Sequence, residues 1–128
     1  MNLSEHPWNN FCLRATEQAP PRREETGFYA LFWYQSEVNN GGHFQYFLNR
    51  THQEEWSLAA RTARELQQET LADNLMQAIL RWQNTARTAP DIVEEVISEA
   101  LEQEFAIFDA KFHELEYMLM AALERAVT

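Results

Sequence analysis

The chain has 128 residues, 45% of them hydrophobic, a single cysteine, and 20 acidic against 10 basic side chains, which gives a net charge of -10. This length fits one domain with its own core, and one cysteine excludes both an intramolecular disulfide and a cysteine-rich zinc module. The negative charge disfavours direct binding to nucleic acid or to an anionic membrane surface, and it favours partners with basic surfaces.

Residues 1–25 contain three of the four prolines and show no sustained helical period, so we predict an extended N-terminal arm. Trp8, Phe11 and Leu13 are apolar enough to dock this arm onto the rest of the chain. The first residues lack the basic start and apolar core of a signal peptide, and no apolar run approaches the roughly 20 residues that span a bilayer as a helix. With its lone cysteine, the chain is expected in the cytoplasm.

A helix is predicted to begin at Thr26, and aromatic residues on nearly all its sides indicate a largely buried element. The glycine pair Gly41 and Gly42 follows Asn39 and Asn40, and these residue types tolerate the left-handed backbone that ends helices. We therefore predict that the helix stops here and that a second, short helix follows at once over residues 44–49.

Apolar residues recur at three- and four-residue steps over residues 56–66 and 71–86, which predicts two amphipathic helices. Pro90 fits the start of a further helix. Residues 91–128 contain neither glycine nor proline, and their apolar residues keep a nearly heptad spacing. One helix over residues 91–126 would be about 54 Å long, so we expect either a bend near residues 104–109 or packing on a second copy. The predicted fold class is all-α: one compact domain of about five to six helices over residues 26–128, with the arm preceding it.

The sequence offers no arrangement typical of an enzyme. Cys12 lies in the proline-bearing arm, and the glycine pair lacks the spacing of a phosphate-binding loop. None of the four histidines follows a glutamate at the three-residue spacing that di-metal helical bundles use. His113, with Asp109 and Glu116 at helical spacing, is the one conceivable weak metal site. We predict a protein without catalytic activity, resident metal or cofactor.

The residues around the glycine pair are interpreted as a structural motif. Amide side chains bond exposed groups at helix ends but are poor acids or bases, and the aromatic residues that follow are expected in the core. The alternative is an active site at a strained turn, which would require a ligand near His43 and Tyr46. The motif comprises Asn39, Asn40, Gly41, Gly42, Gln45, Tyr46, Phe47 and Asn49.

Acidic residues concentrate in the last third of the chain, where residues 91–116 contain nine of them and one lysine. Asp91, then Glu94 or Glu95, then Glu99 and Glu102 recur at three- and four-residue steps, which places a row of carboxylates on one helix face. Like charges at this spacing cost a few tenths of a kcal/mol each. The row is therefore a candidate site for a basic partner, and a solvated surface that maintains solubility is the alternative.

The glycine motif resembles the signature of a bacterial family of DNA-mimic proteins, in which Asn-Gly-Gly is followed by Gln-aromatic-Phe-x-Asn. Glu37-Val38 before the motif and Asp109-x-x-Phe112 near the last helix extend the resemblance. Two positions differ from the family pattern: His43 stands where an aromatic residue is usual, and no glycine occurs around residues 67–69.

The resemblance implies an all-helical fold, a homodimer, no catalysis, and acidic side chains that replace DNA phosphates on the DNA-binding face of a transcription factor. We therefore expect a non-enzymatic binding protein whose partner is a basic protein of that kind. The alternative is a structural or immunity-type interaction module that uses an apolar surface around Trp8, Phe11, Tyr117 and Met118, without DNA mimicry. The two hypotheses differ in how steeply salt weakens binding.

Overall fold

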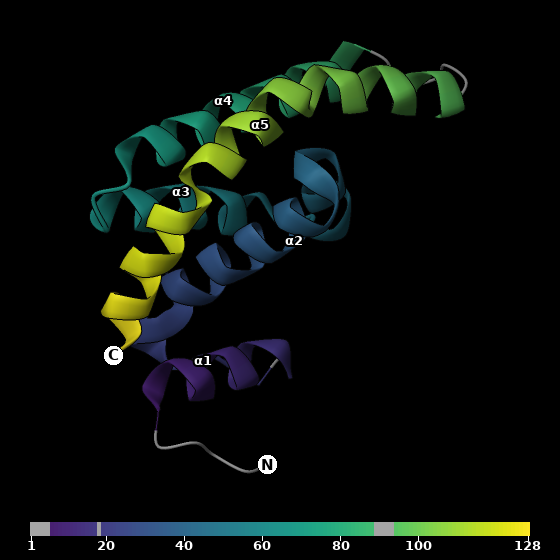
Figure 1. Cartoon of the computed structure of the whole chain (residues 1–128). Coiled ribbons are helices and arrows are strands. Elements are labelled where there is room, and N and C mark those ends of the chain that lie inside the picture. The colour runs from purple at the N-terminus through teal and green to yellow at the C-terminus, as the bar shows by residue number, and fades with distance from the viewer. Residues whose placement is uncertain (1–5, 18, 89–93) are drawn as a thin grey trace.

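The computed structural model of the chain describes residues 6–17, 19–88 and 94–128, and these form helices joined by short connections (Figure 1). No strand occurs within these ranges, and the prediction of an all-α fold is confirmed. In chain order the elements are α1 (Pro7–Thr16), the 3-10 helix η1 (Arg23–Glu25), α2 (Thr26–Asn49), α3 (Gln53–Glu65), α4 (Glu69–Thr88) and α5 (Glu94–Val127).

Four of the helices enclose the core. Helix α2 contacts α3 and α5, and α4 contacts the same two helices, so the four elements form a closed ring. The interior is rich in aromatic side chains, several of them fully buried. Figure 1 shows the end of α4 and the beginning of α5 running together beyond α2 as a projecting hairpin. None of the described helices combines the length and apolar character needed to cross a membrane.

The prediction of an extended N-terminal arm is wrong for residues 7–16, which form α1. Pro7 occupies the first turn of this helix, where the missing N–H has no intrahelical partner to lose. Phe11 and Ala15, four residues apart, are fully buried, and Trp8 stacks on Phe11 with ring centroids 5.7 Å apart. The prolines that suggested an irregular segment therefore begin one helix and, at residues 20–21, separate it from the next.

Helix α3 is followed, two residues after its end, by a residue with left-handed backbone that is not glycine. Gln67 has φ of 68°, the one such non-glycine residue in the described ranges. The N–H of Gln68 donates to the carbonyl of Ala63 at 2.9 Å, and that of Gln67 donates to Arg64 at 3.0 Å. These two bonds form a Schellman cap, which usually has glycine at the position of Gln67.

Helix α5 is one element from Glu94 to Val127, and it changes direction part-way along, from a course beside α4 to one that passes toward α1 (Figure 1). The side chain of Asn74 on α4 donates a hydrogen bond of 2.9 Å to the carbonyl of Phe108. A side chain that donates to a helical carbonyl in this way competes with the backbone hydrogen bonds of the helix, and such competition is an established cause of helix bending. Phe105, Phe112 and Leu119 hold the helix to the core, with no exposed surface.

Candidate functional site

The predicted break in the first long helix lies at Gly42. Its φ of 82° and ψ of 177° interrupt α2, so that Thr26–Gly41 and His43–Asn49 run in different directions. This conformation is open almost only to glycine. A Cβ on Gly42 would lie 2.5 Å from Oδ2 of Asp109 on α5, and one on Gly41 would overlap the side-chain oxygen of Gln45. Gly42 is therefore required both by its backbone conformation and by the close approach of Asp109, and a side chain on Gly41 would displace that of Gln45.

A carboxylate joins the two halves of α2. Oε2 of Glu37, before the break, accepts hydrogen bonds from Nδ2 of Asn49 at 2.9 Å and from Nε2 of Gln45 at 3.0 Å. Gln45 and Asn49 are four residues apart, on one face of the second half. We expected these amides to bond backbone groups at the helix ends, and their described bonds go to the side chain of Glu37 instead. A charged acceptor makes such bonds stronger than neutral ones.

The imidazole of His43 connects the break to α5. Its Nδ1 lies 2.6 Å from Oδ1 of Asp109, and the same oxygen accepts the backbone N–H of His43 at 2.8 Å. Its Nε2 lies 2.7 Å from the hydroxyl of Tyr34. The His43 side chain is fully buried, so both ring nitrogens are satisfied by protein groups alone.

The partners of His43 indicate where its protons lie. Burial raises the pKa of Tyr34 well above its ordinary value, and the neighbouring Tyr46 and Asp109 raise it further, so the hydroxyl keeps its proton. It can donate that proton to Nε2, and Nδ1–H then donates to the carboxylate, which cannot itself donate when ionised. We call Glu37, Gly41, Gly42, His43, Gln45, Asn49 and Asp109 together the glycine joint.

Residues 21–127 match the protein family described as DMP19-like protein, that of DNA mimic protein 19. The chain belongs to this family. A comparison with curated proteins gave no match, and a comparison with solved structures gave none either. The family match supports the resemblance to DNA-mimic proteins, and it leaves α1 of this DMP19-like protein outside the matched range.

The second half of α2 carries the aromatic residues that fill the core of this DMP19-like protein. Phe47 packs on Trp56 of α3, Trp82 of α4 and Phe105 of α5, with ring centroids 4.8, 5.4 and 5.7 Å apart. Tyr46 lies against Tyr34 at 5.0 Å. As the sequence indicated, Tyr46 and Phe47 are buried. Because one short segment contacts all three neighbouring helices, the direction set at Gly42 determines how they meet.

The predicted acidic row of this DMP19-like protein lies at the start of α5. Asp91 is outside the described residues. Glu94, Glu95, Glu99 and Glu102 lie on the α5 backbone, and the description does not extend to their side chains. Figure 1 places the beginning of α5 on the projecting hairpin. The predicted motif thus lies at the break in α2, whereas the predicted acidic row lies on the hairpin. Helix α5 carries the row and also contacts the motif through Asp109.

Sequence reasoning did not identify the contact between His43 and Asp109 in this DMP19-like protein. Asp109 was grouped with His113 as a conceivable metal site, but its carboxylate faces His43, while Nδ1 of His113 lies 3.9 Å from Glu116. The described residues contain no group of three potential ligands that could hold a metal ion. No local signal in the sequence pairs residue 43 with Asp109, because the two residues lie 66 positions apart.

Proposed function

We propose that this protein binds the basic DNA-binding face of a transcription factor or another nucleic-acid-binding protein, and that it acts as a DNA mimic without catalysis. The carboxylates proposed to make the contact are Asp91, Glu94, Glu95, Glu99 and Glu102. Family membership and the net charge of -10 support this function. Phosphate contacts supply much of the affinity of DNA-binding proteins, so carboxylates can compete for the same arginine and lysine side chains.

The charge density of the row supports the proposal. From Glu94 to Glu102 the backbone of α5 rises about 12 Å, at 1.5 Å per residue. One strand of B-DNA places a phosphate at about every 3.4 Å along the helix axis, which gives three to four phosphates over roughly the same distance. Four carboxylates, those of Glu94, Glu95, Glu99 and Glu102, lie on this length of helix. The row therefore carries about the charge of a short stretch of one DNA strand.

The glycine joint attaches α5 to α2 at Asp109, seven residues after Glu102. Asp109 accepts two hydrogen bonds from His43, and Phe105 and Phe112 on either side of it are fully buried. A carboxylate array competes with DNA best when it is held in place before binding, because ordering it on binding would reduce the affinity. We propose that the motif has this positioning role and takes no part in chemistry.

The alternative, an apolar interaction surface, loses part of its support. Phe11 is fully buried in the protein's own core and offers no contact surface, and Trp8 is partly buried where it stacks on Phe11. Tyr117 and Met118 on α5 remain 77% and 42% exposed. They are the surface on which a salt-resistant partner would be expected to bind.

The proposed function is tested by capture of partners on the immobilised protein at low salt. Elution by a salt gradient, with competition by DNA, separates the hypotheses. A mimic is expected to retain a DNA-binding protein that salt releases and that its own recognition DNA displaces. Partners that resist both salt and DNA would contradict mimicry and favour the apolar surface.

Charge-reversed variants locate the site. Changing Glu95, Glu99 and Glu102 to lysine is expected to abolish capture of the DNA-binding protein. The matched control changes Glu17, Glu65 and Glu69 to lysine, which are exposed acidic residues elsewhere, so the net charge shifts equally. Equal loss of capture in both variants would show that total charge matters and would refute the assignment to α5. Circular dichroism verifies that both variants remain helical.

We further propose that the protein is a homodimer. Large apolar side chains are exposed on α4 and α5, with Leu80 at 55% and Ile107 at 72%, and Leu48 of α2 is 52% exposed. Sedimentation equilibrium measures the mass directly, and a mass of one chain at all concentrations would exclude the dimer.

A further inference from the structure

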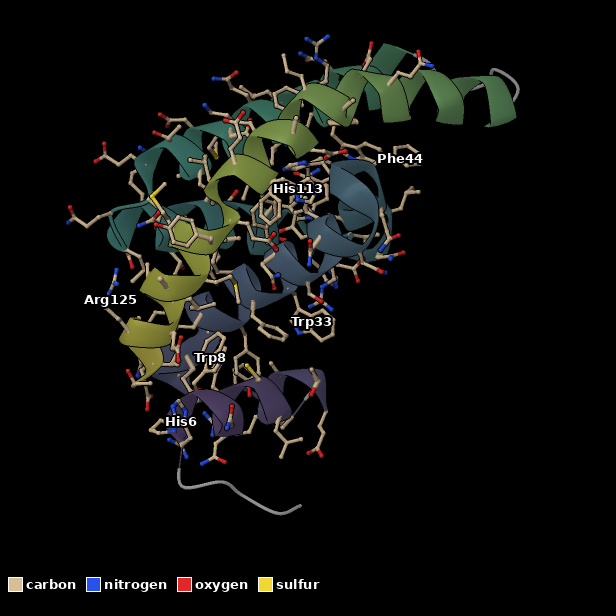
Figure 2. The ribbon with its side chains drawn as sticks, in the orientation of Figure 1. His6, Trp8, Trp33, Phe44, His113 and Arg125 are labelled. Carbon is tan, nitrogen blue, oxygen red and sulfur yellow. The ribbon has the colours of Figure 1, made fainter. Side chains whose placement is uncertain are left out.

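A pocket lies apart from the glycine joint and the acidic row, where the segment before η1, the first half of α2 and the start of α3 meet. Its volume of about 450 Å³ is in the range of pockets that hold small ligands. Apolar side chains dominate its lining, among them Pro20, Tyr29, Trp33 and Leu58. Figure 2 shows Trp33 extending from α2 toward the outside of the molecule.

The charged groups of the pocket leave a negative charge uncompensated. Arg50 donates two hydrogen bonds to Glu55, of 3.1 Å from Nε to Oε2 and 2.5 Å from Nη2 to Oε1, so these two charges neutralise each other. Hydrogen bonding to Glu55 is also the main cause that raises the pKa of Arg50. Glu54, next along the rim, is exposed and makes no ion pair within the described ranges. The pocket therefore disfavours an anion and favours a cation.

The lining itself contains a cation, Arg50, that lies between an aromatic ring and a carboxylate. Its guanidinium carbon lies 4.9 Å from the centre of the Trp33 ring, and its head pairs with a carboxylate. An aromatic face beside a carboxylate binds a guanidinium or ammonium group both through the ring and through the opposite charge. The apolar stems of arginine and lysine bury well against side chains such as Leu58.

We propose that this pocket binds an arginine or lysine side chain of the partner protein, with the stem against Trp33 and Leu58 and the cationic head at Glu54. The inference rests on the proposed function, because it requires a partner with a basic surface. It adds a second anchor, on α2 and α3, apart from the α4–α5 hairpin. A partner of this kind would contact the acidic row with several cationic groups and insert one into the pocket.

Nuclear magnetic resonance with small probes tests the pocket without the partner. The probes are Nα-acetyl-arginine methylamide and its neutral analogue, Nα-acetyl-citrulline methylamide. The arginine probe is expected to shift the indole N–H signal of Trp33 and the amide signals of Leu58, with saturation in the millimolar range. The citrulline probe is expected to bind at least about fivefold more weakly, because it lacks the charge that Glu54 compensates.

Two variants assign the effect to Glu54. Glu54→Gln is expected to weaken binding of the arginine probe about three- to fivefold and to leave binding of the citrulline probe unchanged. Glu65→Gln removes an exposed carboxylate from the other end of α3 and is expected to change neither. Equal binding of both probes, or shifts confined to α5, would overturn the proposal. Retained capture of a DNA-binding protein by Glu54→Gln, together with absent probe shifts, would reject the pocket and leave the proposed function intact.

Discussion

Replacing Asp109 by alanine tests whether α5 is fastened to the break in α2. The carboxylate accepts one hydrogen bond of 2.8 Å from the backbone N–H of His43 and one of 2.6 Å involving Nδ1 of its ring. Hydrogen bonds to charged groups contribute about 1.5–3 kcal/mol each. Because 27% of the Asp109 side chain is exposed, water can enter part of the space that alanine leaves. We expect the free energy of unfolding to fall by about 2–4 kcal/mol.

This loss is large enough to measure by thermal or urea unfolding followed by far-UV circular dichroism. A chain of 128 residues has an unfolding entropy of about 0.27 kcal/mol/K near its midpoint, so Tm should fall by roughly 7–15 °C. The control is Glu104→Ala, which removes an exposed carboxylate from the same helix. Its effect on the free energy of unfolding is expected to stay within about 0.5 kcal/mol.

A double-mutant cycle isolates the contact between the two side chains. His43→Phe keeps a planar ring and removes the ring contacts with Asp109 and Tyr34, while the backbone N–H of residue 43 remains. Asp109→Ala is then expected to cost at least about 1 kcal/mol less than it costs in the parent protein. Additive effects to within about 0.5 kcal/mol, or an Asp109→Ala cost no greater than that of Glu104→Ala, would refute the fastening role.

Three further substitutions or reactions test local features. Gly42→Ala should lower the free energy of unfolding by about 2–3 kcal/mol, because its Cβ would approach Asp109 at a glycine-only φ of 82°; a neutral effect would show that the break is not strained. Gln67→Gly should raise it by about 1 kcal/mol in urea unfolding, since Gln67 has φ of 68°, and a loss of stability would contradict the left-handed cap. Burial and Glu124 raise the pKa of Cys12, so its alkylation by iodoacetamide should reach half its maximal rate at a higher pH than that of free cysteine. Glu124→Gln should lower that pH, and an unchanged profile would show that the neighbouring charge is not felt.

The parts of the fold that are determined by residues close together in the sequence could be predicted from the sequence. The break at Gly42 was predictable because glycine is the residue type that adopts positive φ without cost. The amphipathic helices over residues 53–65 and 69–88 were predictable from their three- and four-residue periods. Helix α1 was missed because two prolines after it and one at its start resembled an irregular segment, although Pro7 is compatible with a first turn.

The contacts that assemble the glycine joint could not be predicted in the same way. His43 and Asp109 are 66 positions apart, and nothing in the local pattern of either residue specifies the other. Glu37 was noted as the residue pair Glu37-Val38 before the motif, but its bonds to Gln45 and Asn49 depend on the direction that the chain takes after Gly42. The spacing of apolar residues along a helix indicates which of its faces is buried. It does not indicate which polar side chains meet where the helix is interrupted.

The acidic residues at the start of α5 can serve either the helix itself or the binding of a basic partner. Their positions along the helix distinguish these two explanations. If α5 begins at Glu94, where its description starts, Glu94 and Glu95 lie in its first turn, where carboxylates stabilise the N-terminal end of a helix dipole by about 0.3–1 kcal/mol each. Glu99 and Glu102 lie beyond that turn, where the dipole gives no such benefit and neighbouring like charges repel. Changing Glu94 and Glu95 to glutamine should therefore lower stability. The same change at Glu99 and Glu102 should leave stability equal or slightly higher and still weaken capture of a basic partner. If the second pair changes neither stability nor capture, solubility alone accounts for those two charges.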